Sequence, residues 1–171
     1  MPLEVPVPDA SLLGKYKQRN AFTDCYSTVV TIPVTLPEFI DAFYTTWWFK
    51  LERWLLALFC RQSSTDKQVS QLARAQTSDM SVWRVESRTE TEILLSAWHT
   101  RSWLCVQSEQ TSSHVVISTN LLFGSAVIPS RSNGQFALLF HLLGGVHRWY
   151  AKCLLAAAAK QLRRKHSRDQ Q

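Results

Sequence analysis

The spacing of hydrophobic residues changes several times along the chain, and each change predicts a new element. Residues 21–34 form a run of β-branched and aromatic side chains, which is typical of a strand, and Pro33 ends it. From Leu36 to Leu58 hydrophobic residues recur at steps of three and four, which predicts helical structure. The bulky residues 46–48 predict a bend that divides this segment into two helices.

The middle of the chain is polar and then returns to a strand pattern. Residues 61–80 contain a loop and helix cap at 63–66 and a short helix over 67–75. Alternating or β-branched stretches then predict four strands, at residues 81–88, 91–98, 102–108 and 114–128. Because the connections between them are short, we expect hairpins and therefore an antiparallel meander.

A turn cluster at residues 129–134 precedes one long helix, expected from Gln135 to about Arg164 and about 40 Å long. Steps of four and three predict a buried stripe on this helix, formed by Leu139, Leu143, Val146, Tyr150, Cys153 and Ala157. The opposite side is expected to carry His141, Arg148, Lys152 and Lys160. The only partner wide enough for such a helix is the sheet.

This order of elements predicts an α+β helix-grip fold, in which a curved antiparallel sheet wraps around the long C-terminal helix. We expect residues 1–20 to form an irregular N-terminal arm, because prolines interrupt them. Residues 21–165 then form a single helix-grip domain, and residues 166–171 form a basic polar tail. At 171 residues the chain is long enough to bury one core.

Composition places the chain among globular proteins, with 46% hydrophobic and 19% charged residues. The net charge of +6 is concentrated near the C-terminus, where residues 162–168 carry four of the nineteen basic side chains. Cations there also complement the helix dipole, so we expect no nucleic-acid partner. The four cysteines lie far apart with no paired spacing, so neither a metal site nor a disulfide is expected.

The N-terminus lacks the basic start and apolar run of a signal peptide. The longest apolar stretch, residues 135–159, contains several charged or polar residues that are costly in lipid. A cytoplasmic location is therefore expected.

Residues 43–51 form an aromatic helix bend, and a second stretch runs from Gly134 through His147-Arg148 to Leu154. Together these two stretches resemble an uncharacterised bacterial family, domain of unknown function 2867. Residues 22–24 and 99–101 also look like its pattern, so the similarity covers residues 20–160. Where that pattern has a proline before the His-Arg pair, this chain has Gly144-Gly145. The family is similar to the helix-grip (START and Bet v 1-like) superfamily, which implies the same architecture and no particular activity.

A curved sheet and a straight helix close imperfectly, so a cavity between them is expected to bind a small molecule. Small residues, including Gly124 and Ala156 to Ala159, would open it, whereas Trp83, Trp98, Trp103 and Trp149 would fill it. The expected ligand is apolar or amphipathic, such as a lipid, held without catalysis and without a cofactor. The residues expected to contact it are Trp47, Trp48, Trp103, His147 and Tyr150, with His147 as the polar anchor.

The stretch WHTRSWL at residues 98–104 has the pattern of a hairpin. We expect Trp98 and Trp103 to form an aromatic pair across its two strands, with His99 and Arg101 exposed at the tip.

Two alternatives remain open. One is a cyclase- or dehydratase-like enzyme using His147 and Tyr150, one helical turn apart, as acid and base. The chain shows no nucleophile elbow, phosphate-binding glycine loop or paired apolar carboxylates to support it. The other is a membrane-peripheral or protein-interaction module, which would use residues 47–56 and the basic tail for membrane or homodimer contact.

Overall fold

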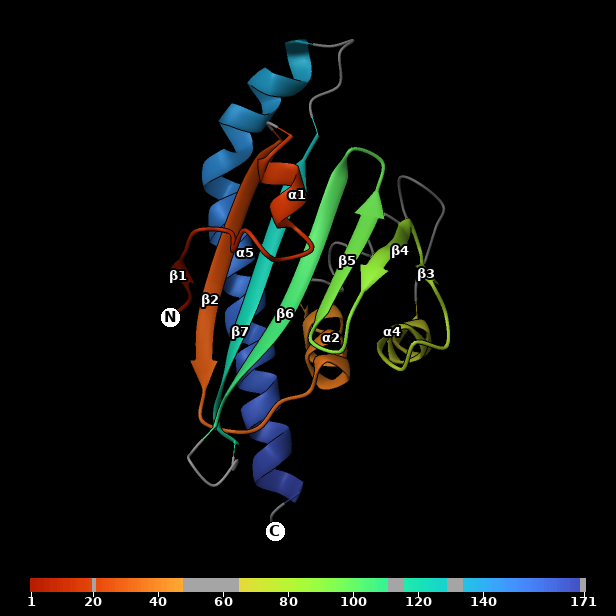
Figure 1. The fold of residues 1–171 in the computed structure, drawn as a ribbon, viewed down its shortest axis with the longest axis vertical. Helices are drawn as coiled ribbons and strands as arrows, with labels where there is room; N and C mark the ends of the chain where they lie inside the picture. The colour runs from red at the N-terminus through yellow and green to blue at the C-terminus, as the bar shows by residue number, and fades with distance from the viewer. Residues whose placement is uncertain (20, 48–64, 111–115, 129–133, 170–171) are drawn as a thin grey trace.

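The computed structural model describes residues 1–19, 21–47, 65–110, 116–128 and 134–169, and describes 116–117 and 134–144 by their backbone alone. The fold is α+β, with a curved seven-stranded antiparallel sheet and a long C-terminal helix (Figure 1). The strands are β1 Leu3–Glu4, β2 Phe22–Val30, β3 Asp79–Met80, β4 Trp83–Arg88, β5 Glu92–Ala97, β6 Thr100–Gln110 and β7 Val116–Val127. The helices are α1 Gly14–Lys17, α2 Leu36–Tyr44, α4 Asp66–Ala73 and α5 Gly134–Asp169.

The strand order in the sheet is β1-β2-β7-β6-β5-β4-β3. The prediction of an antiparallel meander is confirmed, because β4, β5, β6 and β7 are neighbours in chain order. The first predicted strand is β2, which pairs with β7 along its whole length and so joins the two halves of the chain.

Helices α2 and α4 both begin where their sequences provide a cap. Thr35 accepts a bond from the backbone of Glu38, whose side chain bonds back to Thr35, and Pro37 occupies the first turn. Thr65 and Gln68 form the same reciprocal pair at the start of α4, as the cap predicted near residues 63–66 requires. The second half of the predicted helical segment lies outside the described residues.

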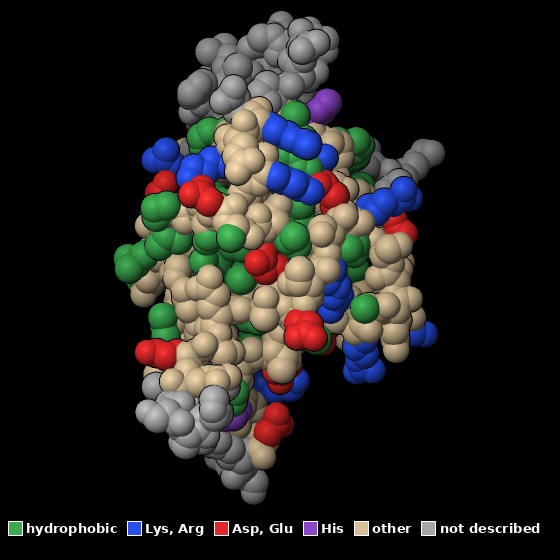
Figure 2. All heavy atoms as spheres, in the orientation of Figure 1, with side chains coloured by type: hydrophobic (Ala, Val, Ile, Leu, Met, Phe, Trp, Pro, Cys, Tyr) green, Lys and Arg blue, Asp and Glu red, His purple; other side chains and the backbone are tan. Residues whose placement is uncertain are grey.

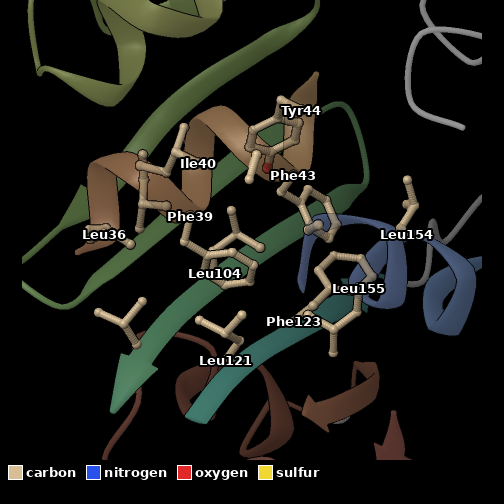
Figure 3. Close-up of a cluster of buried hydrophobic side chains, with 14 of the residues drawn as sticks. Leu36, Phe39, Ile40, Phe43, Tyr44, Leu104, Leu121, Phe123, Leu154 and Leu155 are labelled. Carbon is tan, nitrogen blue, oxygen red and sulfur yellow. The ribbon is translucent and has the colours of Figure 1, made fainter. Parts of the chain in front are cut away.

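One side of the sheet, the helix side, is covered by α2, α4 and α5. Figure 3 shows Phe39 and Phe43 of α2 meeting Leu104 and Phe123 of the sheet, with Leu155 of α5 beside them. The Phe43 and Phe123 ring centroids are 4.7 Å apart. Apolar side chains therefore fill the interface between the sheet and the described C-terminal half of α5.

The N-terminal arm covers the other side of the sheet, which we call the arm side. Its Val7, Leu13 and Tyr16 form a second buried cluster with Trp103 and Cys105. The prediction of an irregular arm is thus only partly right, because the arm adds β1 and α1 and completes a core. Burial on both sides explains why Ile93, Leu94 and Leu95 are all buried in consecutive positions of β5.

Gly124 of β7 permits this close approach of the arm. A Cβ atom at this position would lie 2.6 Å from a Leu13 methyl group and 2.9 Å from the Asp24 carbonyl oxygen. The expectation that Gly124 opens space beneath the terminal helix is wrong, because the space left by its missing side chain is filled by the arm on the opposite side of the sheet.

The buried stripe of α5 differs from the predicted one. The residues that face the core are Ala151, Leu154, Leu155, Ala158, Ala159 and Leu162. Val146 of the predicted stripe is instead 61% exposed, and Cys153 and Ala157 are only half-buried. The helix has apolar residues on two opposite sides, so spacing alone could not show which side meets the sheet. Leu139 and Leu143 lie outside the described side chains.

The helix is also longer than predicted, since α5 has 36 residues and spans about 54 Å. It runs past both ends of the sheet in Figure 1. Residues 166–169 of the predicted tail continue the helix.

We expect Leu13→Ala to destabilise the protein by about 2–5 kcal/mol, because a fully buried side chain would leave a cavity between arm and sheet. The matched control is Leu3→Ala in the same arm, where the side chain is exposed and the change should be near zero. Urea denaturation measures both. Equal stability of the two variants would show that the arm is not part of the cooperative fold.

Candidate functional site

A row of polar side chains crosses the helix side of the sheet, close to the amino-terminal end of β2. Asp24 of β2 is the partner of Ser125 on β7, and Ser125 is the partner of Ser102 on β6. Residues that are partners in neighbouring strands point to the same face of the sheet. Ser102 is in turn the partner of Leu95 on β5, a member of the helix-side core, so all three polar side chains lie on the helix side. All three polar side chains are buried. We call Asp24, Ser125 and Ser102 the polar row.

Asp24 is the centre of the hydrogen bonds in the polar row. Its Oδ1 accepts the backbone N–H of Ser125 at 3.1 Å and the Ser125 hydroxyl at 2.6 Å. Its Oδ2 accepts the Tyr26 hydroxyl at 3.2 Å and lies 3.1 Å from Nε2 of His147 on α5. A buried carboxylate needs such partners to offset its lost hydration.

The direction of these bonds fixes the role of His147. Because the Ser125 hydroxyl donates to Asp24, its oxygen is left to accept from His147 Nε2, 3.2 Å away. The network therefore assigns the proton of the imidazole to Nε2, which faces Asp24 and Ser125 together. In a nucleophilic triad the serine donates to the histidine and the carboxylate binds the other ring nitrogen. The arrangement here is an anchor rather than a triad.

Tyr44 extends the polar row from the side of α2. Its hydroxyl lies 3.0 Å from the Ser102 hydroxyl, and both side chains are buried. Hydroxyl groups from a helix and a strand thus meet inside a mainly apolar interior.

Electrostatics favour an ionised Asp24. Burial raises the pKa of its carboxyl. Hydrogen bonds from His147 and Ser125 and the charge of His147 lower this pKa by more than burial raises it, so the pKa lies below its usual value of 3.8. Burial raises the pKa of Tyr26, and the negative charge of Asp24 raises it further. The tyrosine therefore stays a neutral donor to a charged acceptor.

The structure brings only part of the predicted site together. His147 is 33% exposed in its side chain and lies over the polar row, where it contacts Asp24 and Ser125. Tyr150 is half-buried against the helix-side core. Trp103 lies on the arm side, where its indole donates to Glu92 at 2.8 Å, so it does not face α5. Trp47 follows α2 and is exposed, and Trp48 lies outside the described residues.

The predicted pairing of two tryptophans across the hairpin is wrong. Trp103 is opposite Leu94, and Trp98 lies in the two-residue turn after Ala97, exposed and with a φ of 46°. The strands pair right up to Ala97 and Thr100, which places Trp98 outside the ladder.

The prediction that Arg101 is exposed at the hairpin tip is also wrong, whereas His99 is exposed as expected. The Arg101 side chain is 14% exposed, and its Nε lies 2.5 Å from Glu86 Oε2 and 2.8 Å from the Tyr16 hydroxyl. Lys15 also pairs with Glu86, at 2.7 Å. These charges tie α1 to the sheet, which is why the arginine cannot remain at an exposed tip.

Sequence reasoning missed most of the polar row. Asp24 carried a detectable signal, because a carboxylate in an apolar strand, two residues before Tyr26, lies on the same face as that tyrosine. Ser102 and Ser125 carried none, since their meeting depends on the register of β6 and β7.

Comparisons with known proteins add little at this point. No family model matches the chain, and no curated protein matches it. The chain is similar to a solved structure described as a conserved protein of unknown function, EF2215, from Enterococcus faecalis. That likeness has 12% identity, covers 89% of this chain and 83% of the other, and has a TM-score of 0.34.

Within the described part of the chain, no helix combines the length and apolar character needed to span a bilayer. Cys25, Cys105 and Cys153 are free thiols. Burial raises the pKa of both Cys25 and Cys105 to about 12. Such thiols are poor nucleophiles at neutral pH.

We expect Asp24→Asn to lower stability at pH 7 by about 2 kcal/mol, because the neutral amide weakens four hydrogen-bonding contacts. In the wild type the pKa of Asp24 is lower when folded than when unfolded. Its stabilising contribution is therefore complete above about pH 4 and is lost as the pH falls through the folded pKa.

Chemical denaturation between pH 7 and pH 2 measures this, and the variant should show the weaker acid dependence. Asp79→Asn is the matched control. The pKa of Asp79 is also lowered, chiefly by its bond to Arg84, but the side chain is exposed, so its replacement should leave stability nearly unchanged. An acid dependence equal to that of the wild type in Asp24→Asn would contradict the assignment.

Proposed function

We propose that this protein binds an amphipathic small molecule between the sheet and α5, with the polar group of the ligand at the polar row and no chemical step. The observation that carries the proposal is the polar row itself, together with Tyr44 and His147. These groups come from three strands and two helices and lie near one another on a mainly apolar side of the sheet. A few convergent polar groups in apolar surroundings are typical of small-molecule sites.

Several of these groups have bonding capacity left for a ligand. The hydroxyl of Ser102 can accept from Tyr44 at 3.0 Å and donate its own hydrogen to a ligand. The Nε2 atom of His147 is held by the sheet, which leaves Nδ1 as the ring nitrogen that can meet a ligand. The site would therefore suit a hydroxyl, carbonyl or carboxyl head group.

A buried hydrogen-bond donor on the same side of the sheet also supports a ligand site. Trp83 of β4 packs against the helix-side core, and its buried indole N–H has no hydrogen-bond partner within the described part of the chain. Trp83 lies two residues before Val85. Val85 is the partner of Leu95, and Leu95 is the partner of Ser102 in the polar row. An unpaired buried donor is costly unless a ligand or water accepts from it.

We prefer binding to catalysis because the groups that could act as catalysts, Asp24, Ser125 and His147, are bonded to one another. The alternative of an enzyme using His147 and Tyr150 would need His147 to exchange protons, whereas its Nε2 faces Asp24 and Ser125. Ser125 donates to a carboxylate and is not activated for attack.

We also propose that the architecture is a version of the helix-grip fold, and that the resemblance to domain of unknown function 2867 reflects common descent. Support comes from the curved antiparallel sheet with a long terminal helix on one side. The resemblance in sequence also includes Asp24 and His147, the two residues that join sheet and helix here.

Binding can be tested with a fluorescent fatty acid, cis-parinaric acid, as a probe. We expect saturable binding by the wild type and an affinity about three- to tenfold lower in Ser102→Ala, which loses the hydroxyl that meets the head group, and in Tyr44→Phe, which loses the contact that orients this hydroxyl. Native mass spectrometry of the purified protein reports independently on any retained lipid.

The matched control is Ser27→Ala. Ser27 loses its 2.5 Å bond to Asn120 in this variant but is the partner of Leu122, a residue of the arm side. Its affinity for the probe should equal that of the wild type. No saturable binding by the wild type, or equal losses in all three variants, would refute the proposed site.

A further inference from the structure

The net charge of the protein is carried by one helix. Residues 134–169 contain seven lysines and arginines and a single acidic residue, Asp169, at the end. The whole chain has nineteen basic and thirteen acidic residues, so the remainder has twelve of each and is neutral. Figure 2 shows basic and acidic side chains close together on the arm side, as expected for a neutral surface. α5 is therefore a cation-rich helix on a neutral body.

The side of α5 opposite its buried stripe combines apolar and basic residues. Residues at steps of three and four form this outer face, namely Val146, Trp149, Cys153, Ala156, Lys160 and Arg164. Val146 is 61% exposed and Trp149 is 56% exposed. Lys160 and Arg164 are exposed one and two turns beyond Ala156. The face spans about 27 Å along the helix.

More cations line the flank of α5 next to β2. Arg148 is exposed, and the Lys152 ammonium lies 5.8 Å from the centre of the Tyr26 ring. Arg163 donates to the Val29 carbonyl at 2.9 Å. No acidic residue occurs on α5 before Asp169, so these charges are not neutralised along the helix itself.

We propose that the outer face of α5 is a docking surface for an anionic phospholipid membrane. Trp149 and Val146 would enter the interfacial region, where tryptophan is favoured, while Lys160, Arg164 and the flanking cations meet lipid phosphates. An anionic surface attracts each nearby cation and thereby favours this orientation. This surface differs from the segment at residues 47–56 and does not depend on the site between sheet and helix.

The exposed apolar residues favour lipid over nucleic acid as the partner. Phosphates of a nucleic acid would satisfy the cations equally well, but a duplex backbone offers nothing to an exposed valine beside a tryptophan. A membrane accepts both kinds of side chain in one plane.

The test is flotation of the full chain with vesicles of phosphatidylcholine and phosphatidylserine, compared with vesicles of phosphatidylcholine alone. We expect binding to the anionic vesicles that weakens with salt. Removal of one cation should lower the partition about fivefold, so Lys160→Glu/Arg164→Glu should lower it by at least about 25-fold. Trp149→Ala should lower it severalfold while leaving the salt dependence in place.

The matched control for charge is Lys67→Glu/Arg74→Glu, which makes the same change in net charge at exposed positions on or next to α4. The control for the indole is Trp98→Ala in the exposed hairpin turn. Both should bind as the wild type does, and circular dichroism confirms that all variants are folded. Equal loss in either control would refute the proposal. Absence of vesicle binding by the wild type would also refute the proposal. This holds whether or not the protein binds a labelled DNA duplex through Lys160 and Arg164.

Discussion

The contact between Asp24 and His147 determines how the terminal helix sits on the sheet. A buried carboxylate must be surrounded by donors, and here they come from β2, β7 and α5 at once. Once His147 faces the sheet, the helical repeat places Ala151, Leu154, Leu155 and Ala158 beneath it, in the apolar core. The same rotation turns Val146 and Trp149 outward. The polar contact thus agrees with the burial of one apolar side of α5 and the exposure of the other.

Much of the architecture could be predicted from local patterns because those patterns are strong. Alternation and β-branching identified β2 and the strands of the meander, and short connections implied their antiparallel pairing. Caps identified the start of α4, where a threonine and a glutamine bond each other across the first turn. Each of these features depends on residues close together in the chain.

Features that depend on distant residues could not be predicted in this way. The buried side of α5 could not be chosen from spacing, since leucines and alanines compete with Val146 and Cys153. Trp103 has ordinary strand spacing, and only the arm on its side of the sheet determines where it is buried. Of the candidate site, His147 was predicted, whereas its partners Asp24 and Ser125 are 123 and 22 residues away in the sequence.

The two ends of the sheet offer little free backbone for pairing with other strands. A row of seven strands could present two long edges to which strands of other copies would add. Both outermost strands, β1 and β3, have only two residues, so each offers little backbone for pairing. Next to β1, where β2 continues past its short neighbour, the guanidinium of Arg163 occupies the Val29 carbonyl. The terminal helix thereby also occupies part of the free edge of β2.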